Sequence, residues 1–346
     1  MTKRKADRTA SFWGMARAFL HRHCTKARKM SPETVDAYRI ALECYVGYLG
    51  EAQGVEKADV SFEHFERPCV KGWSAWMSAE KGYAPATVAL RLAALRSFLA
   101  FCASEDAALA ALHEQAKSVR APKNPRKPIE YLDSEELAAL LAANSGATAK
   151  SRRNRMMLMM LYESAARVSE LTSMELGDVS LSKPAHVSVT GKGGKTRSVP
   201  IGDKLVDHLR VYLAEFHPRG AKADPSRPLF YSIRDGRPHA LSPDTVSAVL
   251  KQAANAARAS CPSIPERVHC HLVRKSRAMA LYKSGVPLPI VMQMLGHESM
   301  STTSAFYAFA TLDMMSKAVE GAAPEIIRQD TGWLTEERRE ALYSLR

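Results

Sequence analysis

Long apolar stretches are scarce in this sequence of 346 residues. The longest lies near Met156–Tyr162 and is far shorter than the roughly 20 residues that a helix needs to span a bilayer. The N-terminus is basic, but no apolar core of a secretion signal follows it. These absences argue against a membrane-bound or secreted protein.

Cysteines are few and scattered. The chain has 6 of them, and none belongs to a CxxC pair. Two short strings, from His21 to Cys24 and from His269 to His271, contain metal-ligating residue types. Neither string has a partner cluster at the spacing of zinc ligands. The pattern predicts reduced thiols in a cytoplasmic protein and no bound metal.

Positive charge, by contrast, is in excess. The chain carries 49 Lys and Arg residues against 36 Asp and Glu residues, a net charge of +13. This excess favours a polyanionic partner, because Lys and Arg release condensed counterions when they bind phosphates, although membrane surfaces attract the same charge. Asp7 is the sole acid among the first thirty residues. We interpret residues 1–10 as a basic arm near DNA, with a solubilising tail as the alternative.

The chain length favours two domains, at roughly 100–200 residues each. Residues 11–116 have the apolar spacing of helices. One predicted helix begins at Ser31 and Pro32 and ends at Gly50, another begins at Ala84, and a less regular one lies near residues 62–80. The sequence therefore predicts a small all-α domain over residues 11–116.

A segment rich in proline and positive charge follows, over residues 117–130. Proline keeps such a segment extended. Its positive charges would suit a segment that lies along a DNA phosphate backbone. The alternative interpretation is an ordinary exposed hinge. The candidate DNA contacts in this linker are Lys123, Arg126 and Lys127.

Residues 131–321 combine helices with a short hairpin. Asp133 to Glu136 begins one helix, and Val187–Val189 and Arg197–Ile201 are predicted strands joined by a glycine-rich turn. Further helices are expected near residues 153–162, 203–216, 242–259, 274–283, 289–295 and 302–318. A tail over residues 322–346 contains a final helix that opens at Trp333. We therefore expect a mainly α chain whose second domain has a small antiparallel sheet.

Four strings in the second domain contain residue types suited to phosphate chemistry. In the first, Tyr162 to Leu171, Arg167 precedes Val-Ser-Glu-Leu, and Ser169 is a candidate cap for the next helix. A guanidinium can place two hydrogen bonds on the oxygens of a phosphodiester and keeps its charge at any working pH. The alternative for Arg167 is a surface ion pair, which is the usual role of an isolated arginine.

The second string is the hairpin turn Gly191-Lys192-Gly193-Gly194-Lys195-Thr196-Arg197. A lysine on such a turn can donate a proton to an alkoxide leaving group. The turn lacks the spacing of a nucleotide-binding P-loop. Lys195 and Arg197 are interpreted as DNA backbone contacts or as a solvated edge.

The third and fourth strings add histidines and a tyrosine. His271 and Arg274 are three residues apart and so share one helix face, with Lys275 beside them as a candidate DNA contact. In the fourth string, Leu295 to Tyr307, Gly296 is typical of a helix C-terminus and is followed by His297. A tyrosine hydroxyl can serve as a nucleophile.

These four strings, in this order, resemble the tyrosine recombinase (phage integrase) family, and the resemblance extends over nearly the whole chain. It implies an N-terminal helical core-binding, SAM-like domain and an α+β catalytic domain. It also implies catalytic roles for Arg167, Lys192, His271, Arg274, His297 and Tyr307. The sequence departs from the family pattern in three places. Ala165 stands where a glycine is common, Lys275 where a histidine is common, and Tyr307 is ten residues after His297 rather than nine, with Phe306 at the ninth.

By resemblance, Tyr307 attacks a DNA phosphorus to give a 3′-phosphotyrosyl bond, and Lys192 protonates the leaving 5′ oxygen. Because the ester conserves the bond energy, we expect neither ATP nor metal as a cofactor. The implied partners are double-stranded DNA at specific sites, a homotetramer on that DNA, and accessory DNA-bending proteins. Two alternatives stay open, a non-catalytic DNA-binding regulator on the same scaffold and a type IB topoisomerase.

Overall fold

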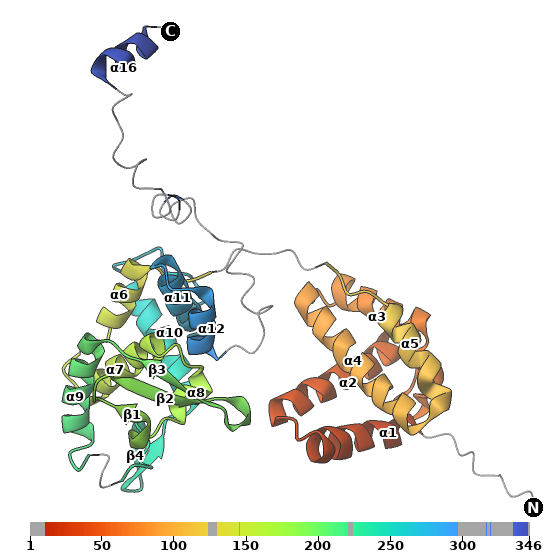
Figure 1. Cartoon of the computed structure of the whole chain (residues 1–346). Helices are drawn as coiled ribbons and strands as arrows, with labels where there is room; N and C mark the ends of the chain where they lie inside the picture. The colour runs from red at the N-terminus through yellow and green to blue at the C-terminus, as the bar shows by residue number, and fades with distance from the viewer. Residues whose placement is uncertain are drawn as a thin grey trace, which may run out of the picture. The chain divides into compact units, whose positions relative to one another are not determined.

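The computed structural model describes residues 11–123, 130–144, 146–220, 224–296 and 335–344, with the single residues 316 and 319 (Figure 1). The chain divides into two compact units, Met1–Lys127 and Pro128–Arg346. This division falls within residues 117–130, the segment predicted as the linker. Lys117, however, belongs to the last turn of a helix and binds Glu114 at 2.8 Å.

The first unit is helical throughout its described part. Its α-helices are α1 (Phe12–Ala18), α2 (Pro32–Gln53), α3 (Arg67–Ala79), α4 (Pro85–Glu105) and α5 (Ala110–Ser118). A π-helical stretch, η1 (Phe19–Ala27), continues α1, and 3-10 turns lie at η2 (Lys57–Asp59), η3 (Phe62–Phe65) and η4 (Ala107–Leu109). The predicted all-α character of this domain is confirmed.

The α2 helix begins as predicted but ends later. Pro32 occupies its first turn, where a missing N–H costs nothing. The prediction that Gly50 ends the helix is wrong, because Gly50 lies inside α2. The helix ends at Gly54, which has φ +68° and donates its N–H toward the carbonyl of Leu49. Such a left-handed turn is the position at which glycine is favoured.

Aromatic rings fill the core of this unit. The rings of Trp73 and Tyr45 lie 5.0 Å apart edge to face, and those of Phe12 and Phe98 lie 5.8 Å apart in the same geometry. Among the described helices, α4 alone is long and apolar enough to cross a membrane by length and composition. It is the core helix of this unit, since Phe98 on it is fully buried.

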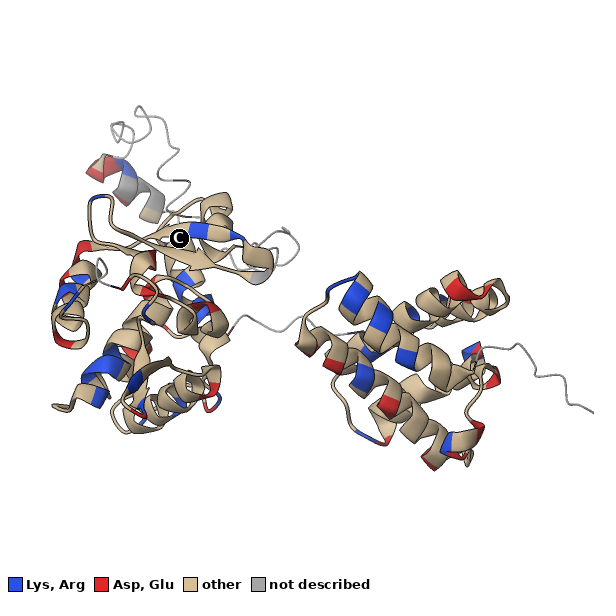
Figure 2. Ribbon diagram, turned by 90° about the horizontal axis from the view of Figure 1, so that it is seen from below, with Lys and Arg blue, Asp and Glu red and all other residues tan. Residues whose placement is uncertain are grey.

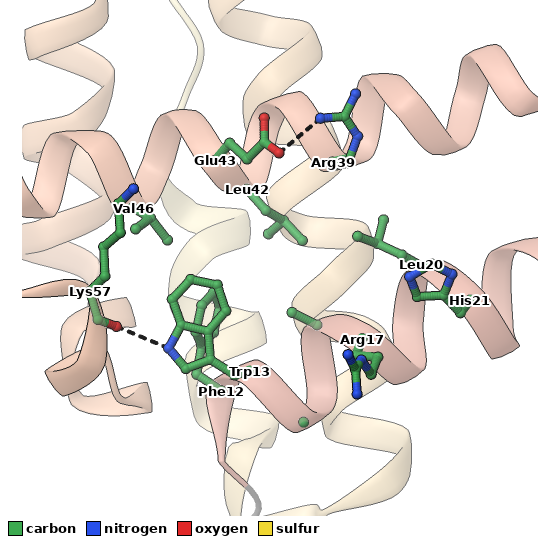
Figure 3. Close-up of a pocket in the computed structure, with 12 residues that line it drawn as sticks. Phe12, Trp13, Arg17, Leu20, His21, Arg39, Leu42, Glu43, Val46 and Lys57 are labelled. Atoms are coloured by element: carbon green, nitrogen blue, oxygen red, sulfur yellow. Dashed lines mark hydrogen bonds and ion pairs between the residues drawn. The ribbon is translucent and has the colours of Figure 1, made fainter.

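A groove of about 650 Å³ opens between α1 and α2 (Figure 3). Trp13 stands at its edge with 46% of its surface exposed, and its indole N–H donates to the carbonyl of Lys57 at 3.0 Å. Arg39 and Glu43 pair across one turn of α2 at 2.8 Å. The lining comes from the first unit, whereas the four motif strings belong to the second.

The second unit surrounds two small antiparallel sheets with helices. Its helices are α6 (Ser134–Ala142), α7 (Ala149–Glu163), α8 (Val168–Thr172), α9 (Asp203–Phe216), α10 (Pro243–Ala257), α11 (Cys270–Lys283), α12 (Leu288–Leu295) and the tail helix α16 (Glu336–Tyr343). Short 3-10 turns lie at η5 (Leu176–Asp178) and η6 (Lys192–Gly194). The strands are β1 (Val179–Ser180), β2 (His186–Thr190), β3 (Thr196–Pro200), β4 (Tyr231–Arg234) and β5 (Arg237–Ala240).

The predicted hairpin is present as β2 and β3, paired so that Val187 lies opposite Val199. Strand β1 adds a third member in the order β1-β2-β3, and β4 and β5 form a separate hairpin. Val187, Val189 and Val199 are fully buried and belong to the same apolar core as Met157 and Leu161 of α7. The mainly α fold with a small antiparallel sheet is confirmed.

A smaller apolar cluster holds α12 against α11. It joins Ala165 to Met279 of α11 and to Leu288, Val291 and Leu295 of α12. Ala165 lies in the turn between α7 and α8, so this cluster ties that turn to the helix that ends just before His297. The fold thereby brings the first motif string, the helix of the third and the described start of the fourth, Leu295 and Gly296, into one region of the second unit.

Candidate active site

Arg167 lies at the junction between α7 and α8. It is the N-cap residue of α8, and its backbone N–H donates to the Glu170 carboxylate at 2.8 Å. The prediction that Ser169 caps this helix is wrong, because Ser169 lies within α8 and Glu170 provides the capping contact. A carboxylate at the third helical position can satisfy the free N–H of the residue that precedes the helix.

The turn before Arg167 is tight. Ala165 has φ +47°, a left-handed conformation in which side chains other than glycine are disfavoured, and it is fully buried. Its carbonyl accepts a hydrogen bond from Arg274 at 2.6 Å. The alanine that replaces the family's usual glycine therefore adopts the glycine-like conformation.

Valine at this turn is expected to destabilise the protein. Ala165→Val should lower the free energy of unfolding by about 2 kcal/mol, because a β-branched residue resists positive φ and the side chain at this position is fully buried. Urea unfolding followed by circular dichroism measures the change. Ala256→Val, at an exposed position of α10, is the control and should cost less than about 1 kcal/mol. Equal losses in the two variants would contradict a strained turn.

Three arginines converge on the carboxylate of Glu170, whose side chain is 3% exposed. Arg167 approaches it at 2.6 Å, Arg197 at 2.8 Å and Arg274 at 3.7 Å. Burial alone would raise the pKa of this carboxyl, but hydrogen bonds from Arg197 and Arg167 outweigh burial and lower the pKa to about 2. Glu170 is therefore ionised and holds the cations together.

Sequence reasoning assigned no role to Glu170. One available signal was its position three residues after Arg167, which is the spacing of a helix-capping carboxylate. The contacts with Arg197 and Arg274, by contrast, depend on the folded chain.

Removing this charge should produce a pH-dependent loss of stability. A carboxyl with a lowered pKa stabilises the fold above its unfolded pKa of about 4.5, and this contribution disappears as the pH falls toward 2. Glu170→Gln should thus cost about 3 kcal/mol at pH 7, and less as the pH drops from 4.5 to 2. Urea unfolding at pH 7, 4 and 3 measures this difference. Glu266→Gln, at an exposed position, is the control; a pH-independent loss in the Glu170 variant would contradict the assignment.

Arg274 is buried on α11, with 2% of its surface exposed. Its guanidinium donates to the carbonyl of Ala165 at 2.6 Å and to that of Leu295. Burial and the neighbouring charge of Arg167 lower its pKa to about 10, so it stays cationic near neutral pH. Arg167, by contrast, has 44% of its side chain exposed. The two arginines therefore present one accessible and one buried positive charge.

His271 lies near the start of α11, one helical turn before Arg274. The residue is exposed, yet partial desolvation of its ring and the nearby charges of Lys275 and Arg274 lower the pKa of the imidazole. The ring is therefore neutral near pH 7 and can accept a proton. His269, two residues earlier, is the N-cap residue of α11, and its side chain accepts the N–H of Leu272 at 3.1 Å.

Lys192 opens the turn η6 between β2 and β3, and its side chain lies outside the described part of the chain. Gly193 and Gly194 have φ of +78° and +73°, so the turn requires residues that tolerate this conformation. A Cβ on Gly191 would lie 3.0 Å from a carboxylate oxygen of Glu170. The backbone that leads into Lys192 therefore touches the carboxylate that binds Arg167.

His297 and Tyr307 lie outside the described residues, as does the helix predicted near residues 302–318 apart from Ser316. Gly296, directly before His297, ends α12 in a left-handed conformation with φ +61°. This confirms the predicted helix C-terminus. A Cβ on Gly296 would lie 3.1 Å from Arg197, so the entry to the fourth motif string also approaches the arginine cluster.

The predicted DNA contacts fall into three groups. Lys123 and Lys195 are exposed, and Lys275 is half-buried on α11. Arg197 is not on a solvated edge, because its side chain is 13% exposed and paired with Glu170. Arg126 and Lys127 lie outside the described residues, as do the basic residues of the arm at 1–10. Lysines and arginines occur on the helices of both units (Figure 2).

Within the part of the chain that the structure describes, His, Cys, Asp and Glu side chains form no cluster of three suited to a metal ion. Cys24 and Cys270, from the two strings noted in the sequence, are buried free thiols. The arrangement in the second unit consists of three arginines around the single carboxylate of Glu170, with His271 one helical turn before Arg274.

Comparison with known proteins identifies the family of both domains. Residues 130–312 match the phage integrase family, and residues 19–106 match the phage integrase N-terminal SAM-like domain. Tyrosine recombinase XerD of Staphylococcus saprophyticus is 32% identical over 277 residues, which cover 80% of this chain and 88% of the relative. Tyrosine recombinase XerC of Pseudomonas savastanoi pv. phaseolicola is 28% identical over 307 residues, covering 89% and 95%.

Solved structures show the same fold. The XerH site-specific recombinase bound to difH substrate, in a pre-cleavage complex, has a TM-score of 0.59 at 20% identity and covers 84% of this chain and 81% of that one. A lambda integrase tetramer bound to a Holliday junction has a TM-score of 0.63 at 16% identity and covers 87% and 78%. The first family match spans more than half of the chain. The chain therefore belongs to the phage integrase family and is a tyrosine recombinase.

Proposed function

We propose that the protein is a site-specific DNA recombinase whose active site comprises Arg167, Lys192, His271, Arg274, His297 and Tyr307. The observation that carries this proposal is the convergence of Arg167 and Arg274 on the buried carboxylate of Glu170. Two guanidinium charges held at one place, one of them accessible, suit a DNA phosphate that gains charge during the reaction.

In the proposed cleavage step, the Tyr307 oxygen forms a bond to phosphorus and the bond from phosphorus to the 5′ oxygen breaks. The phenol proton passes to neutral His271, and Lys192 gives a proton to the leaving 5′ oxygen. An unperturbed phenol has a pKa near 10, so nearby cations favour its phenolate. Arg167 and His297 bind the phosphate oxygens, and Arg274 adds the second, buried charge.

The products of this step are a 3′-phosphotyrosyl ester and a free 5′-hydroxyl. A 5′-hydroxyl from another strand reverses the step by attacking the same phosphorus and releasing Tyr307. One phosphoester replaces another in each direction, so the reaction needs no external energy source such as ATP.

The proposed substrate is double-stranded DNA, in agreement with the net charge of +13. XerH and lambda integrase, which share the fold, are seen bound to DNA, and lambda integrase is seen as a tetramer on a Holliday junction. We propose a homotetramer on DNA for this chain as well. Exposed Lys123 and Lys195, and half-buried Lys275, are the proposed phosphate contacts among the described residues. Accessory DNA-bending proteins stay a prediction.

A covalent-complex assay tests the proposal. The full chain is incubated with nicked DNA carrying its recombination site, which footprinting on the DNA flanking its own gene can identify, and denaturing gels then detect protein-linked DNA. The expected adduct carries the 3′ end of the cleaved strand and leaves a 5′-hydroxyl that polynucleotide kinase can label. Specific DNA binding without any adduct would instead support a non-catalytic regulator. Rapid relaxation of supercoiled DNA of any sequence would support a type IB topoisomerase.

A further inference from the structure

We propose that Arg197 is a positioning residue that clamps together the segments carrying Arg167, Lys192 and His297. It was interpreted from the sequence as a DNA contact or a solvated residue, and the structure gives it different neighbours. This inference rests on the proposed function, because it assigns Arg197 to the support of the same active site.

The guanidinium of Arg197 uses all three of its nitrogens on protein atoms. Its Nη1 and Nη2 donate to the two carboxylate oxygens of Glu170 at 3.2 and 2.8 Å, and its Nε donates to the carbonyl of Met294 at 2.8 Å. The paired contact joins β3 to α8, the helix that Arg167 caps. The contact with Met294 joins β3 to the last turn of α12, three residues before His297.

Two glycines allow this close approach. A Cβ on Gly296 would meet the Nη1, Cδ and Cζ atoms of Arg197 at 3.1 to 3.3 Å. A Cβ on Gly191 would meet Glu170 at 3.0 Å and Arg197 at 3.8 Å. The backbones directly before His297 and Lys192 therefore lie against the same salt-bridged pair.

Lysine cannot replace this arrangement. A guanidinium is planar and presents donors in several fixed directions, so it can bind a carboxylate with one edge and a carbonyl with another. An ammonium is a compact point charge and cannot maintain the same three contacts. With 13% of its side chain exposed, Arg197 also offers little surface to a DNA phosphate. Its contacts therefore fix geometry within the protein rather than on DNA.

The test compares full-length Arg197→Leu and Arg197→Lys with the wild type. Cleavage of nicked DNA is measured in a single turnover, and DNA affinity is measured over a series of salt concentrations. Both variants should cleave about 10²-fold more slowly, because misplacing reacting groups by about 1 Å costs that much. Their DNA affinity and its salt dependence should stay close to the wild-type values.

A phosphate contact would behave differently. Loss of one such contact should weaken binding and lower the slope of log affinity against log salt by about 1. That result for Arg197→Leu, or full cleavage activity in Arg197→Lys, would overturn the proposal. Lys204→Met is the control, since it removes one exposed positive charge from α9 and should leave cleavage unchanged.

Hydrogen exchange keeps this test independent of activity. In both Arg197 variants the backbone amides of residues 288–296 should exchange faster than in the wild type and in Lys204→Met. If the wild type forms no covalent adduct, the proposed function fails, and faster exchange still supports the clamp. If the wild type forms the adduct, and the Arg197 variants have wild-type rates of both hydrogen exchange and cleavage, the proposed function stands and only the clamp is wrong. If Arg197→Leu fails to fold, cleavage and hydrogen exchange are both measured on Arg197→Lys.

Discussion

Tyr307→Phe is expected to abolish formation of the covalent protein–DNA complex. The substitution removes one oxygen, the atom proposed to attack phosphorus, and keeps the aromatic ring. The cleavage rate should fall by more than about 10⁴-fold, as when other enzymes lose a covalent nucleophile. DNA affinity should change less than about threefold, since phosphate contacts by Lys and Arg provide most of it. Denaturing gels and a DNA-binding titration measure the two effects on one preparation.

A second variant tests the spacing between His297 and the nucleophile. The double substitution Phe306→Tyr and Tyr307→Phe moves the hydroxyl to the position that is more common in the family. In the helix predicted here, a shift of one residue turns a side chain by about 100°. We expect no rescue of cleavage. Rescue would show that the active site is built for the shorter spacing and would contradict the assignment of Tyr307.

Substitution of Arg167 and Arg274, the two arginines proposed to be catalytic, should separate chemistry from stability. Arg167→Ala should lower the cleavage rate by about 10²–10³-fold, as expected for loss of one group that stabilises developing charge. Arg167→Ala should lower the free energy of unfolding by about 1 kcal/mol or less, because the Arg167 side chain is 44% exposed. Arg274→Ala should lower the rate at least as much and also cost about 3–5 kcal/mol, because Arg274 is buried beside Glu170.

Single-turnover cleavage and urea unfolding measure these two quantities for each variant. Arg210→Ala is the matched control, because Arg210 forms an exposed pair with Asp207 on α9. It should affect neither quantity beyond error. If Arg167→Ala destabilised the protein as strongly as Arg274→Ala, the accessible and the buried charge would be equivalent, which contradicts the roles proposed for them.

The sequence was sufficient for those features that short strings determine. The turn that contains Lys192 and the helix end at the glycine before His297 each follow from a few consecutive residues. The role of Arg197 could not be predicted in this way. Its partners Glu170 and Met294 are 27 and 97 positions away in the chain. A hairpin arginine has the same local signature whether it faces solvent or a buried carboxylate.

Some secondary structure was missed for different reasons. Strand β1 has two residues, which is too short for an alternating pattern. The β4–β5 hairpin was predictable, because its turn contains Asp235 and Gly236, both with positive φ, and this pair is a strong hairpin signal. The choice of Gly50 rather than Gly54 as the end of α2 failed because the backbone of Gly50 stays helical, whereas Gly54 has the left-handed φ of +68° that ends the helix. Either glycine can adopt that conformation, so the residue type alone does not decide where the helix ends.

The most direct test of the account identifies the residue linked to DNA. Wild-type protein trapped on nicked DNA is digested with protease and nuclease, and mass spectrometry locates the nucleotide that stays attached. We expect the phosphate on the oxygen of Tyr307, joined to the 3′ end of the cleaved strand. Attachment to any other residue, or to the 5′ end, would contradict the proposed active site.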